Sequence, residues 1–149
     1  GVNSKPVLAV DEYAMYTYSA AGFIGTARRH QLAGGAKLTG AVDVVDLLSD
    51  GTFVYWLEAT GRLLRYPIAG GAASILVDGM PNVESLAMLK GILWISTRAG
   101  VLRYDPSCHL PPVRVSATAG LHGRMAPFGE ALATLAADPS PRVVLLASP

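Results

Sequence analysis

The sequence predicts an all-β chain built from a repeated antiparallel unit. Three observations predict it. Short runs rich in β-branched and aromatic residues, such as "FVYWLEA" and "ILWISTRA", are separated by Gly or Pro about every eight to twelve residues. No segment keeps the apolar period of about 3.6 residues that marks an amphipathic helix. A pattern of strands and turns also recurs about every 36 to 40 residues.

The repeat is clearest in "VYWLEATGRLLRYPIAGG", which reads as strand, turn, strand and glycine pair. A second copy, "LWISTRAGVLRYDP", sets Trp94 against Trp56 and Arg103 against Arg65, and both pairs have an offset of 38 (94 − 56 and 103 − 65). The unit is therefore expected to be an apolar strand, a tight turn, an aromatic strand, a glycine turn and a strand that ends in arginine.

An earlier and a later copy extend the pattern to both ends of the chain. "MYTYSAAGFIGTARRHQLAGG" places Arg29 against Arg65 at an offset of 36 (65 − 29), and the turn before it places Asp11 against Asp50. The later copy, "TLAADPSPRVVLLAS", is weaker. "FGEALATLAAD" is rich in Ala and Leu, but its place in the repeat predicts the first strand of that last copy instead of a helix.

Four short strands in each such repeat are typical of a β-propeller blade. The predicted fold is a single partial β-propeller domain of four-stranded antiparallel blades, about three and a half in this chain. The expected blade units are about 6–41, 42–80 and 81–120, followed by an incomplete unit of two strands at 121–149. Trp56 and Trp94 lie on central strands and are predicted to be buried between blades.

Three pieces, "LAVDEYAMYTY", "SDGTFVYWLEATGRLLRYPIAGG" and "GILWISTRAGVLRYDP", carry a resemblance to known proteins. They resemble bacterial repeat propellers of the YWTD/NHL-like type, whose blades read roughly "AVDxxxVYW…GxLxRxPxxGG". The resemblance extends over residues 6 to 106. It implies the propeller fold and an extracellular or periplasmic location, and it leaves the activity open because such propellers include ligand-binding, partner-binding and enzymatic members.

Composition argues against two classes of partner. Only 15% of residues are charged, and the net charge is +1, so no nucleic acid or anionic membrane surface is expected to bind. The longest stretch without charge, residues 13–27, contains Thr, Ser and Tyr. It is shorter than the roughly 20 apolar residues of a spanning helix, so no membrane span is predicted.

Arg29, Arg65 and Arg103 recur once per copy and are the candidate ligand-binding residues. An arc of guanidinium groups could bind a small anionic ligand that carries a carboxylate or a phosphate. Alternatively, each arginine stem packs on a neighbouring aromatic ring, Tyr66 or Tyr104, and leaves its charged head in water.

No catalytic residue, metal site or cofactor is predicted. The possible soft metal ligands lack the paired spacing of zinc sites, and the glutamates form no spaced acid pair. Asp11 and Asp50 recur in one turn, where they either line a funnel or hydrogen-bond nearby backbone. The residues considered for metal binding or acid chemistry are His30, Cys108, His109, His122, Glu58 and Glu84.

The favoured function is a non-catalytic interaction or assembly module that binds a partner chain or a ligand. The alternative is part of a propeller hydrolase or lyase with a site in the central funnel, so the question of an enzyme stays open. Metal content distinguishes the two, because the funnel site of the alternative would use metal-binding side chains from several blades.

An unfinished ring leaves a strand edge that can recruit another chain. The last predicted strand, "RVVLLAS", is apolar and has little charge to protect its edge. The chain is therefore expected to form a homodimer or to join the remainder of a longer propeller. The expected junction residues are Val143, Val144, Leu145 and Leu146.

Overall fold

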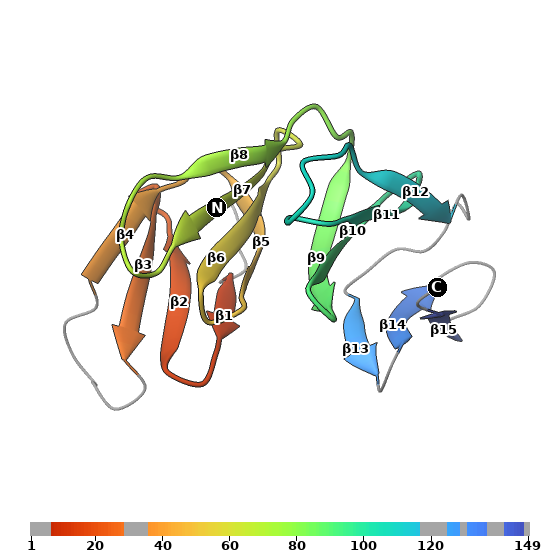
Figure 1. The fold of residues 1–149 in the computed structure, drawn as a ribbon, viewed down its shortest axis with the longest axis horizontal. Helices are drawn as coiled ribbons and strands as arrows, with labels where there is room; N and C mark the ends of the chain where they lie inside the picture. Colours follow the sequence, from red (N-terminus) through yellow and green to blue (C-terminus); the bar gives the residue numbers. More distant parts are fainter. Residues whose placement is uncertain (1–6, 29–35, 117–124, 129–130, 137–141, 148–149) are drawn as a thin grey trace. The chain divides into compact units, whose positions relative to one another are not determined.

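The computed structural model describes residues 7–28, 36–116, 125–128, 131–136 and 142–147. Every regular element in these ranges is a β-strand, and the strands form four antiparallel sheets (Figure 1). The all-β prediction is confirmed. The chain divides into two compact units, Gly1–Asp78 and Gly79–Pro149, and each is described by itself.

The first unit contains two four-stranded sheets, in which each strand pairs with the next along the chain. The first sheet consists of β1 (Leu8–Val10), β2 (Ala14–Ser19), β3 (Phe23–Arg28) and β4 (Ala36–Gly40). The second sheet consists of β5 (Val44–Ser49), β6 (Phe53–Glu58), β7 (Leu63–Pro67) and β8 (Ser74–Val77).

The second unit contains one four-stranded and one three-stranded sheet. The third sheet consists of β9 (Val83–Leu89), β10 (Ile92–Thr97), β11 (Gly100–Tyr104) and β12 (Val113–Ser116). The fourth sheet consists of β13 (Ala126–Phe128), β14 (Ala131–Ala136) and β15 (Arg142–Ala147).

The prediction of two strands in the last copy is wrong. β14 pairs with β13 as well as with β15, so "FGEALATLAAD" contains the second strand of its sheet and not the first. The first strand, Ala126–Phe128, was missed because the first-strand position of this copy was assigned to "FGEALATLAAD". The prediction of a strand in place of a helix is confirmed.

The register of the first two strands repeats at a fixed interval along the chain. The directly opposed pairs are Ala9 with Tyr16, Leu48 with Tyr55, Ala87 with Trp94, and Ala126 with Ala133, so successive members differ by 39 (55 − 16, 94 − 55 and 133 − 94). Trp94 therefore corresponds to Tyr55, and the predicted equivalence of Trp94 with Trp56 is wrong by one residue.

One shorter turn explains this error. The N–H of Glu58 donates to the carbonyl of Arg62 (2.9 Å), so residues 59–61 lie between these two paired residues. Gly61 has the positive φ of 88° that such a turn requires. Only Arg98 and Ala99 lie between the paired Thr97 and Gly100 at the corresponding turn of the third sheet. Equivalent residues of the second strands, such as Tyr55 and Trp94, are therefore 39 positions apart in the sequence. Equivalent residues of the third strands, Arg65 and Arg103, are 38 positions apart.

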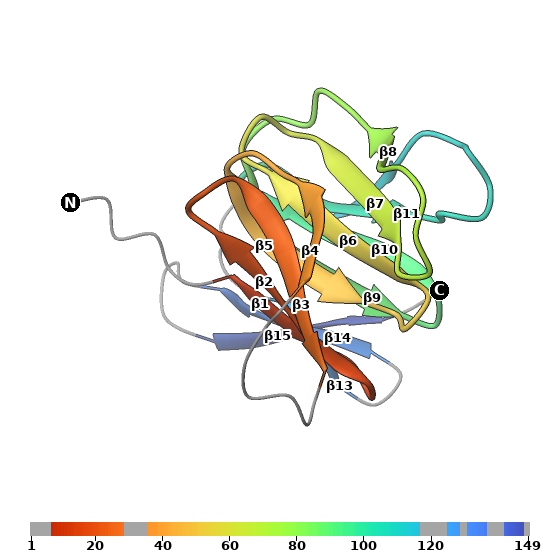
Figure 2. The same cartoon turned by 90° about the vertical axis from the view of Figure 1, so that its left-hand side faces the viewer.

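The core of the first unit lies between its two sheets. Tyr16 (1% exposed) and Ile24 (0%) from the first sheet pack in one cluster with Leu47 (4%), Val54 (0%) and Trp56 (0%) from the second. In Figure 2 the first sheet of this unit lies in front of the second. Since side chains alternate along a strand, Tyr55 and Trp56 lie on opposite faces of the second sheet. The predicted burial of Trp56 between sheets is confirmed.

Trp94 is the centre of a smaller cluster in the second unit. It is 2% exposed and packs with Ala87, Leu89, Val101 and Met125. Met125 directly precedes β13, so residues next to the fourth sheet contribute to this cluster. The predicted burial of Trp94 is confirmed as well.

The same β-bulge occurs between the third and fourth strands of all three four-stranded sheets. The register shifts after Ile24, Leu63 and Val101, three residues that are at most 1% exposed. A bulge increases the local right-handed twist of the paired strands. Its recurrence at equivalent buried positions gives the outer strand of each sheet the same twist.

A left-handed residue before the sheet also recurs. Asp43 (φ 43°) and Asn82 (φ 53°) adopt this conformation, which Asp and Asn tolerate better than other side-chain-bearing residues. Their carbonyl oxygens accept hydrogen bonds from the N–H groups of Ala59 (2.9 Å) and Arg98 (3.1 Å). The backbone therefore has the same left-handed residue and the same hydrogen bond just before the second and the third sheet.

Replacing Trp56 by alanine tests the packing between the first two sheets. We expect Trp56→Ala to lower the free energy of unfolding by about 3–5 kcal/mol, because it leaves a cavity in the cluster. Urea denaturation followed by circular dichroism measures the change. The control, Tyr13→Ala, removes a side chain that is 69% exposed and should change stability by at most about 0.5 kcal/mol. Equal effects of the two substitutions would contradict the assignment of Trp56 to the core.

Candidate functional site

The recurrent aspartates are fixed at the first turn of their sheets. Asp11 accepts hydrogen bonds at Oδ1 from the backbone N–H groups of Tyr13 (2.8 Å) and Ala14 (2.9 Å). Asp50 makes the same pair of bonds with Thr52 (2.8 Å) and Phe53 (2.7 Å). The expectation that these side chains hydrogen-bond nearby backbone is confirmed.

Asp11 also connects the two sheets of the first unit. Its Oδ2 accepts a hydrogen bond of 2.7 Å from the hydroxyl of Ser49, the last residue of β5. Burial raises the pKa of Asp11, but the hydrogen bonds from Ser49, Tyr13, Ala14 and Tyr16 outweigh burial and hold the pKa below its usual value of 3.8. Asp11 therefore stabilises the fold above that pH, and the contribution is lost as the pH falls through the lowered pKa.

A buried tyrosine accompanies each of these aspartates. The hydroxyl of Tyr55 donates to Asp50 Oδ2 over 3.0 Å, and Tyr16 hydrogen-bonds Asp11. Burial, reinforced by the neighbouring carboxylate, raises the pKa of both Tyr16 and Tyr55 to about 12. The neutral phenols stabilise the fold fully below pH 10, and this stabilisation is lost as the pH rises through about 12.

The third sheet replaces this polar pair with apolar residues. Trp94 stands at the position of Tyr55, and Leu89, which pairs with Ile92 across the turn, stands at the position of Asp50. Lys90 and Gly91 form the turn, with φ values of 51° and 77°, as in the type I′ hairpin. Among the described residues, Trp94 Nε1 has no hydrogen-bond partner.

Two of the three predicted ligand-binding arginines, Arg65 and Arg103, lie on described strands. Arg65 lies opposite Tyr55 with its guanidinium 4.6 Å from the centre of the Phe53 ring, and Arg103 lies opposite Trp94. Arg29 lies outside the described residues. The residue opposite Tyr16 in β3, at the position of Arg65, is Thr26. Anion binding by these arginines stays a prediction.

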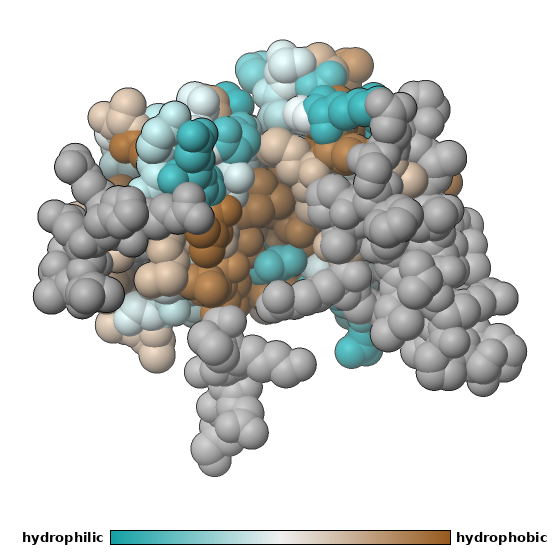
Figure 3. All heavy atoms as spheres, turned by 90° about the horizontal axis from the view of Figure 1, so that it is seen from below, coloured by the Kyte–Doolittle hydropathy of each residue, from teal (hydrophilic) through white to brown (hydrophobic). Residues whose placement is uncertain are grey.

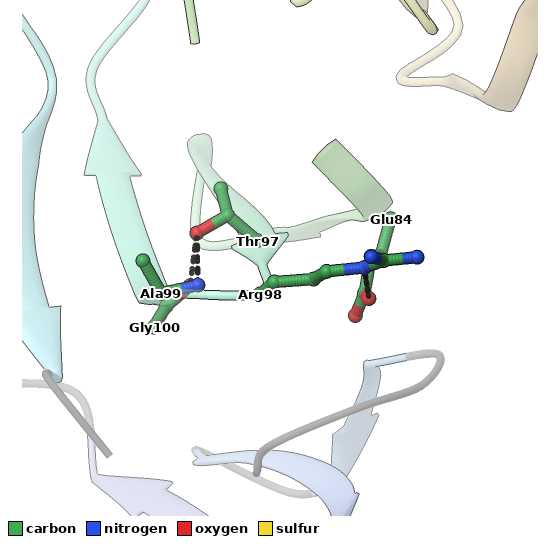
Figure 4. A network of polar contacts seen from close by, with 5 residues as sticks. All are labelled: Glu84, Thr97, Arg98, Ala99 and Gly100. Carbon is green, nitrogen blue, oxygen red and sulfur yellow. Dashed lines mark hydrogen bonds and ion pairs between the residues drawn. The ribbon is translucent and has the colours of Figure 1, made fainter. Parts of the chain in front are cut away.

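The glutamates that were considered for acid chemistry serve separate structural contacts. Glu58 is 5% exposed, and its Oε1 accepts hydrogen bonds from Trp56 Nε1 (3.3 Å) and the N–H of Val42 (3.2 Å). Glu84 pairs with Arg98 over 3.6 Å in the second unit (Figure 4). Each carboxylate is committed to a different contact, and neither is directed at a shared reaction centre.

The described residues contain neither a cluster of metal ligands nor a helix that could cross a membrane. No three His, Cys, Asp or Glu side chains in the ranges that the structure describes lie close enough together to hold a metal ion. Within the same ranges, no helix could cross a membrane. His30 and His122 lie outside the described residues, whereas Cys108 and His109 are exposed.

An apolar face of the first sheet is exposed. It points away from the second sheet and comprises Leu8 (49% exposed), Val10 (59%), Met15 (40%) and the exposed Thr17, and we call it the outer face. Hydrophobic residues visible at the surface are brown in Figure 3. The second sheet buries the residues at the corresponding positions, which include Leu47, Val54 and Trp56.

Sequence reasoning missed the outer face. The strand register places Leu8 on Leu47, Met15 on Val54 and Thr17 on Trp56, with the same offset as Asp11 and Asp50, but this offset does not show which residues are buried. The second sheet buries this face and the first sheet exposes it, and only the structure shows this difference.

The predicted junction strand lies at an edge. In the described part of the fourth sheet, β15 pairs with β14, and the strand order places it opposite β13 at the border of the sheet. Val143, Val144, Leu145 and Leu146 belong to this strand. Their role in an interface stays a prediction.

Solved structures with the same arrangement of sheets identify the fold. The computationally designed Ika4 protein matches with a TM-score of 0.72 at 16% identity, over 99% of this chain and 94% of that chain. This chain has a β-propeller fold. Each four-stranded sheet is a blade, as the sequence predicted, and the fourth blade is represented by three described strands.

Two natural proteins with a similar fold have longer chains. A chain of the nidogen/laminin complex matches with a TM-score of 0.67 at 14% identity, over 87% of this chain and 54% of that chain. BamB from Moraxella catarrhalis matches with 0.70 at 12% identity, over 93% and 42%. The chain thus spans about half the length of these two propellers. No family model and no curated protein sequence matches it, so the YWTD/NHL type stays a prediction.

The Asp50–Tyr55 pair provides a test of the electrostatics. We expect Asp50→Asn to lower the pKa of Tyr55, because the carboxylate raises it by charge and by hydrogen bonding. The pKa should stay above 10, because burial is the largest cause. Carbon-13 NMR of labelled tyrosine, assigned with Tyr55→Phe, measures the titration. Asp105→Asn in the second unit is the control, and an unchanged Tyr55 titration in Asp50→Asn would refute the pairing.

Proposed function

We propose that this chain is a non-catalytic propeller module that binds a partner chain through the outer face of its first blade. The observation that carries this proposal is the exposure of Leu8, Val10 and Met15 on a face whose counterpart in the second blade buries Leu47 and Val54. The first blade thus exposes a surface of the kind that the second blade buries against its neighbour.

The chemistry of the outer face suits a protein partner. Its residues are uncharged, and each square ångström of apolar surface removed from water contributes about 25 cal/mol. Contiguous exposed apolar surface on a soluble domain commonly marks an interaction site. Met15 adds an unbranched side chain that can adapt to the shape of a partner.

The structural likeness is consistent with this proposal. One neighbour was solved in the nidogen/laminin complex, so a propeller chain of related fold occurs together with another protein there. The extracellular or periplasmic location implied by the resemblance to bacterial repeat propellers belongs to the same proposal. A small anionic ligand at Arg65 and Arg103 is compatible with it, because those residues lie on other blades.

A matched pair of leucines tests whether the outer face is reserved for binding. Leu47→Ala should destabilise the monomeric chain by about 2–5 kcal/mol, because Leu47 is 4% exposed and packs in the core. Leu8→Ala, at the equivalent position, should change the free energy of unfolding by at most about 0.5 kcal/mol. Urea denaturation at concentrations where light scattering reports a monomer provides the measurement. If Leu8→Ala is as damaging as Leu47→Ala, the outer face is core and the proposal fails.

Metal analysis separates this module from a propeller hydrolase or lyase. We expect purified protein to contain no stoichiometric divalent ion after dialysis, as judged by elemental mass spectrometry. The reason is that the described carboxylates of Asp11, Asp50, Glu58 and Glu84 have structural partners. One bound ion per chain would favour the enzymatic alternative.

A further inference from the structure

We infer that the edge of β12 in the third blade binds an extended, acidic segment of a partner protein, which adds to the blade as a further strand. This surface belongs to another blade than the outer face, so it is a second interaction site beyond the proposed function. Three features of β12 favour such a partner: its position in the sheet, the exposure of its residues and its charge.

β12 is the border strand of the third sheet. The strand order of that sheet is β12-β11-β10-β9, so β12 pairs with β11 on one side. In an antiparallel pair, successive residues direct their backbone N–H and C=O groups alternately toward and away from the partner strand. In the described part of this sheet, the groups of β12 that point away from β11 meet no other strand, and such a row is a template for an added chain.

β12 differs from the outer strands of the first two blades in its exposure. All residues of Val113–Ser116 are exposed, and they include Val113 (60%) and Val115 (42%). β4 and β8 instead contain half-buried or buried residues, such as Leu38 and Val77. Valine favours strands because its branched side chain packs well on a pleated surface. A strand added at this edge therefore covers aliphatic surface in addition to forming main-chain hydrogen bonds.

The segment that leads to β12 is ordered by its own turn. Asp105 Oδ1 accepts hydrogen bonds from the N–H (2.9 Å) and the hydroxyl (2.6 Å) of Ser107, and the N–H of Cys108 donates to the carbonyl of Asp105 (3.3 Å). Pro111 and Pro112 restrict φ directly before the strand. An edge that is ordered before binding loses less conformational entropy when a partner pairs with it.

The charge of this edge selects the partner. Arg114 is the charged residue of β12, and it is exposed. Its Nη1 donates to the carbonyl of Ala99 (3.3 Å), which holds the guanidinium beside the sheet, and a guanidinium has further N–H groups for a carboxylate.

The arrangement of side chains along the strand specifies the partner further. Side chains alternate along a strand, so Arg114 and Val113 lie on opposite faces of the sheet. A positive charge on an edge strand disfavours basic segments, whereas carboxylates complement it. The partner that fits is an extended segment with aliphatic residues on one face and acidic residues on the other.

Two fluorescently labelled peptides test the inference on the full chain. One is a short acetylated peptide of alternating valine and glutamate, and the other has lysine in place of each glutamate. The glutamate peptide should bind with a dissociation constant at least about tenfold lower than that of the lysine peptide, because its charges complement Arg114. Fluorescence anisotropy measures both affinities. The amide NMR signals of β12 should shift on binding, because the new main-chain hydrogen bonds form there.

Substitution of Arg114 locates the contact. Arg114→Gln should abolish the preference for the glutamate peptide, and Arg114→Glu should reverse it in favour of the lysine peptide, a gain that a failure to fold cannot produce. The matched control is Arg62→Glu, which changes the net charge by the same amount at an arginine whose side chain is 46% exposed. This control should keep the preference for the glutamate peptide.

Three results would overturn the inference. They are equal affinities for the two peptides, unshifted β12 signals at millimolar glutamate peptide, and a preference that Arg62→Glu reverses as Arg114→Glu does. In the last case the net charge of the chain, and not this edge, would attract the peptide. Leu8→Ala, which tests the proposed function, should leave peptide binding unchanged, so the two proposals succeed or fail separately.

Discussion

No blade of this chain can bury both of its faces by itself, and the rest of the structure depends on that constraint. Four short strands form a sheet that hydrogen-bonds internally but leaves two apolar faces in water. The cluster of Tyr16, Ile24 and Trp56 shows the solution, in which an aromatic face packs on the aliphatic and tryptophan face of the next sheet. Burial of one large aromatic side chain removes about 150–250 Å² from water, enough to contribute several kcal/mol.

The polar groups of the first unit serve this packing. Asp11 accepts hydrogen bonds from the backbone of its own turn and from the Ser49 hydroxyl of the following blade. Glu58 accepts hydrogen bonds from the indole N–H of Trp56 and from the backbone N–H of Val42. Buried or half-buried carboxylates are costly unless hydrogen bonds compensate them. Here each one connects two segments of chain, so residue types that often perform catalysis have a positional role.

Much of the fold could be predicted from the sequence, because the turns and the aromatic strands are local signals. The all-β class, the blades, the turn role of Asp11 and Asp50, and the burial of both tryptophans follow from such signals. The register could not be predicted from the offset between copies. The pairing of two strands also depends on the number of residues in the turn between them, and the offset does not show that number. The shorter turn at Arg98 and Ala99 therefore misaligned Trp94 with Trp56.

The strand register was also needed to compare the candidate ligand-binding arginines. Arg29, Arg65 and Arg103 look equivalent in the sequence, yet Thr26 is the residue opposite Tyr16 in the first sheet. The outer face was hidden for a different reason. Leu8 and Leu47 have identical chemistry, and only their burial, 49% against 4% exposed, shows that one is in the core and the other is available.

The difference in length between the two turns that follow the second strand has a practical consequence. A longer loop with Gly61 and a shorter loop at Arg98 and Ala99 lead into third strands whose side chains face the same way. The chain therefore absorbs an added residue at this loop without reversing a face. That makes the loop at 59–61 a suitable place to insert a fluorescent label or an affinity peptide, since Ala59 and Thr60 are already exposed to solvent.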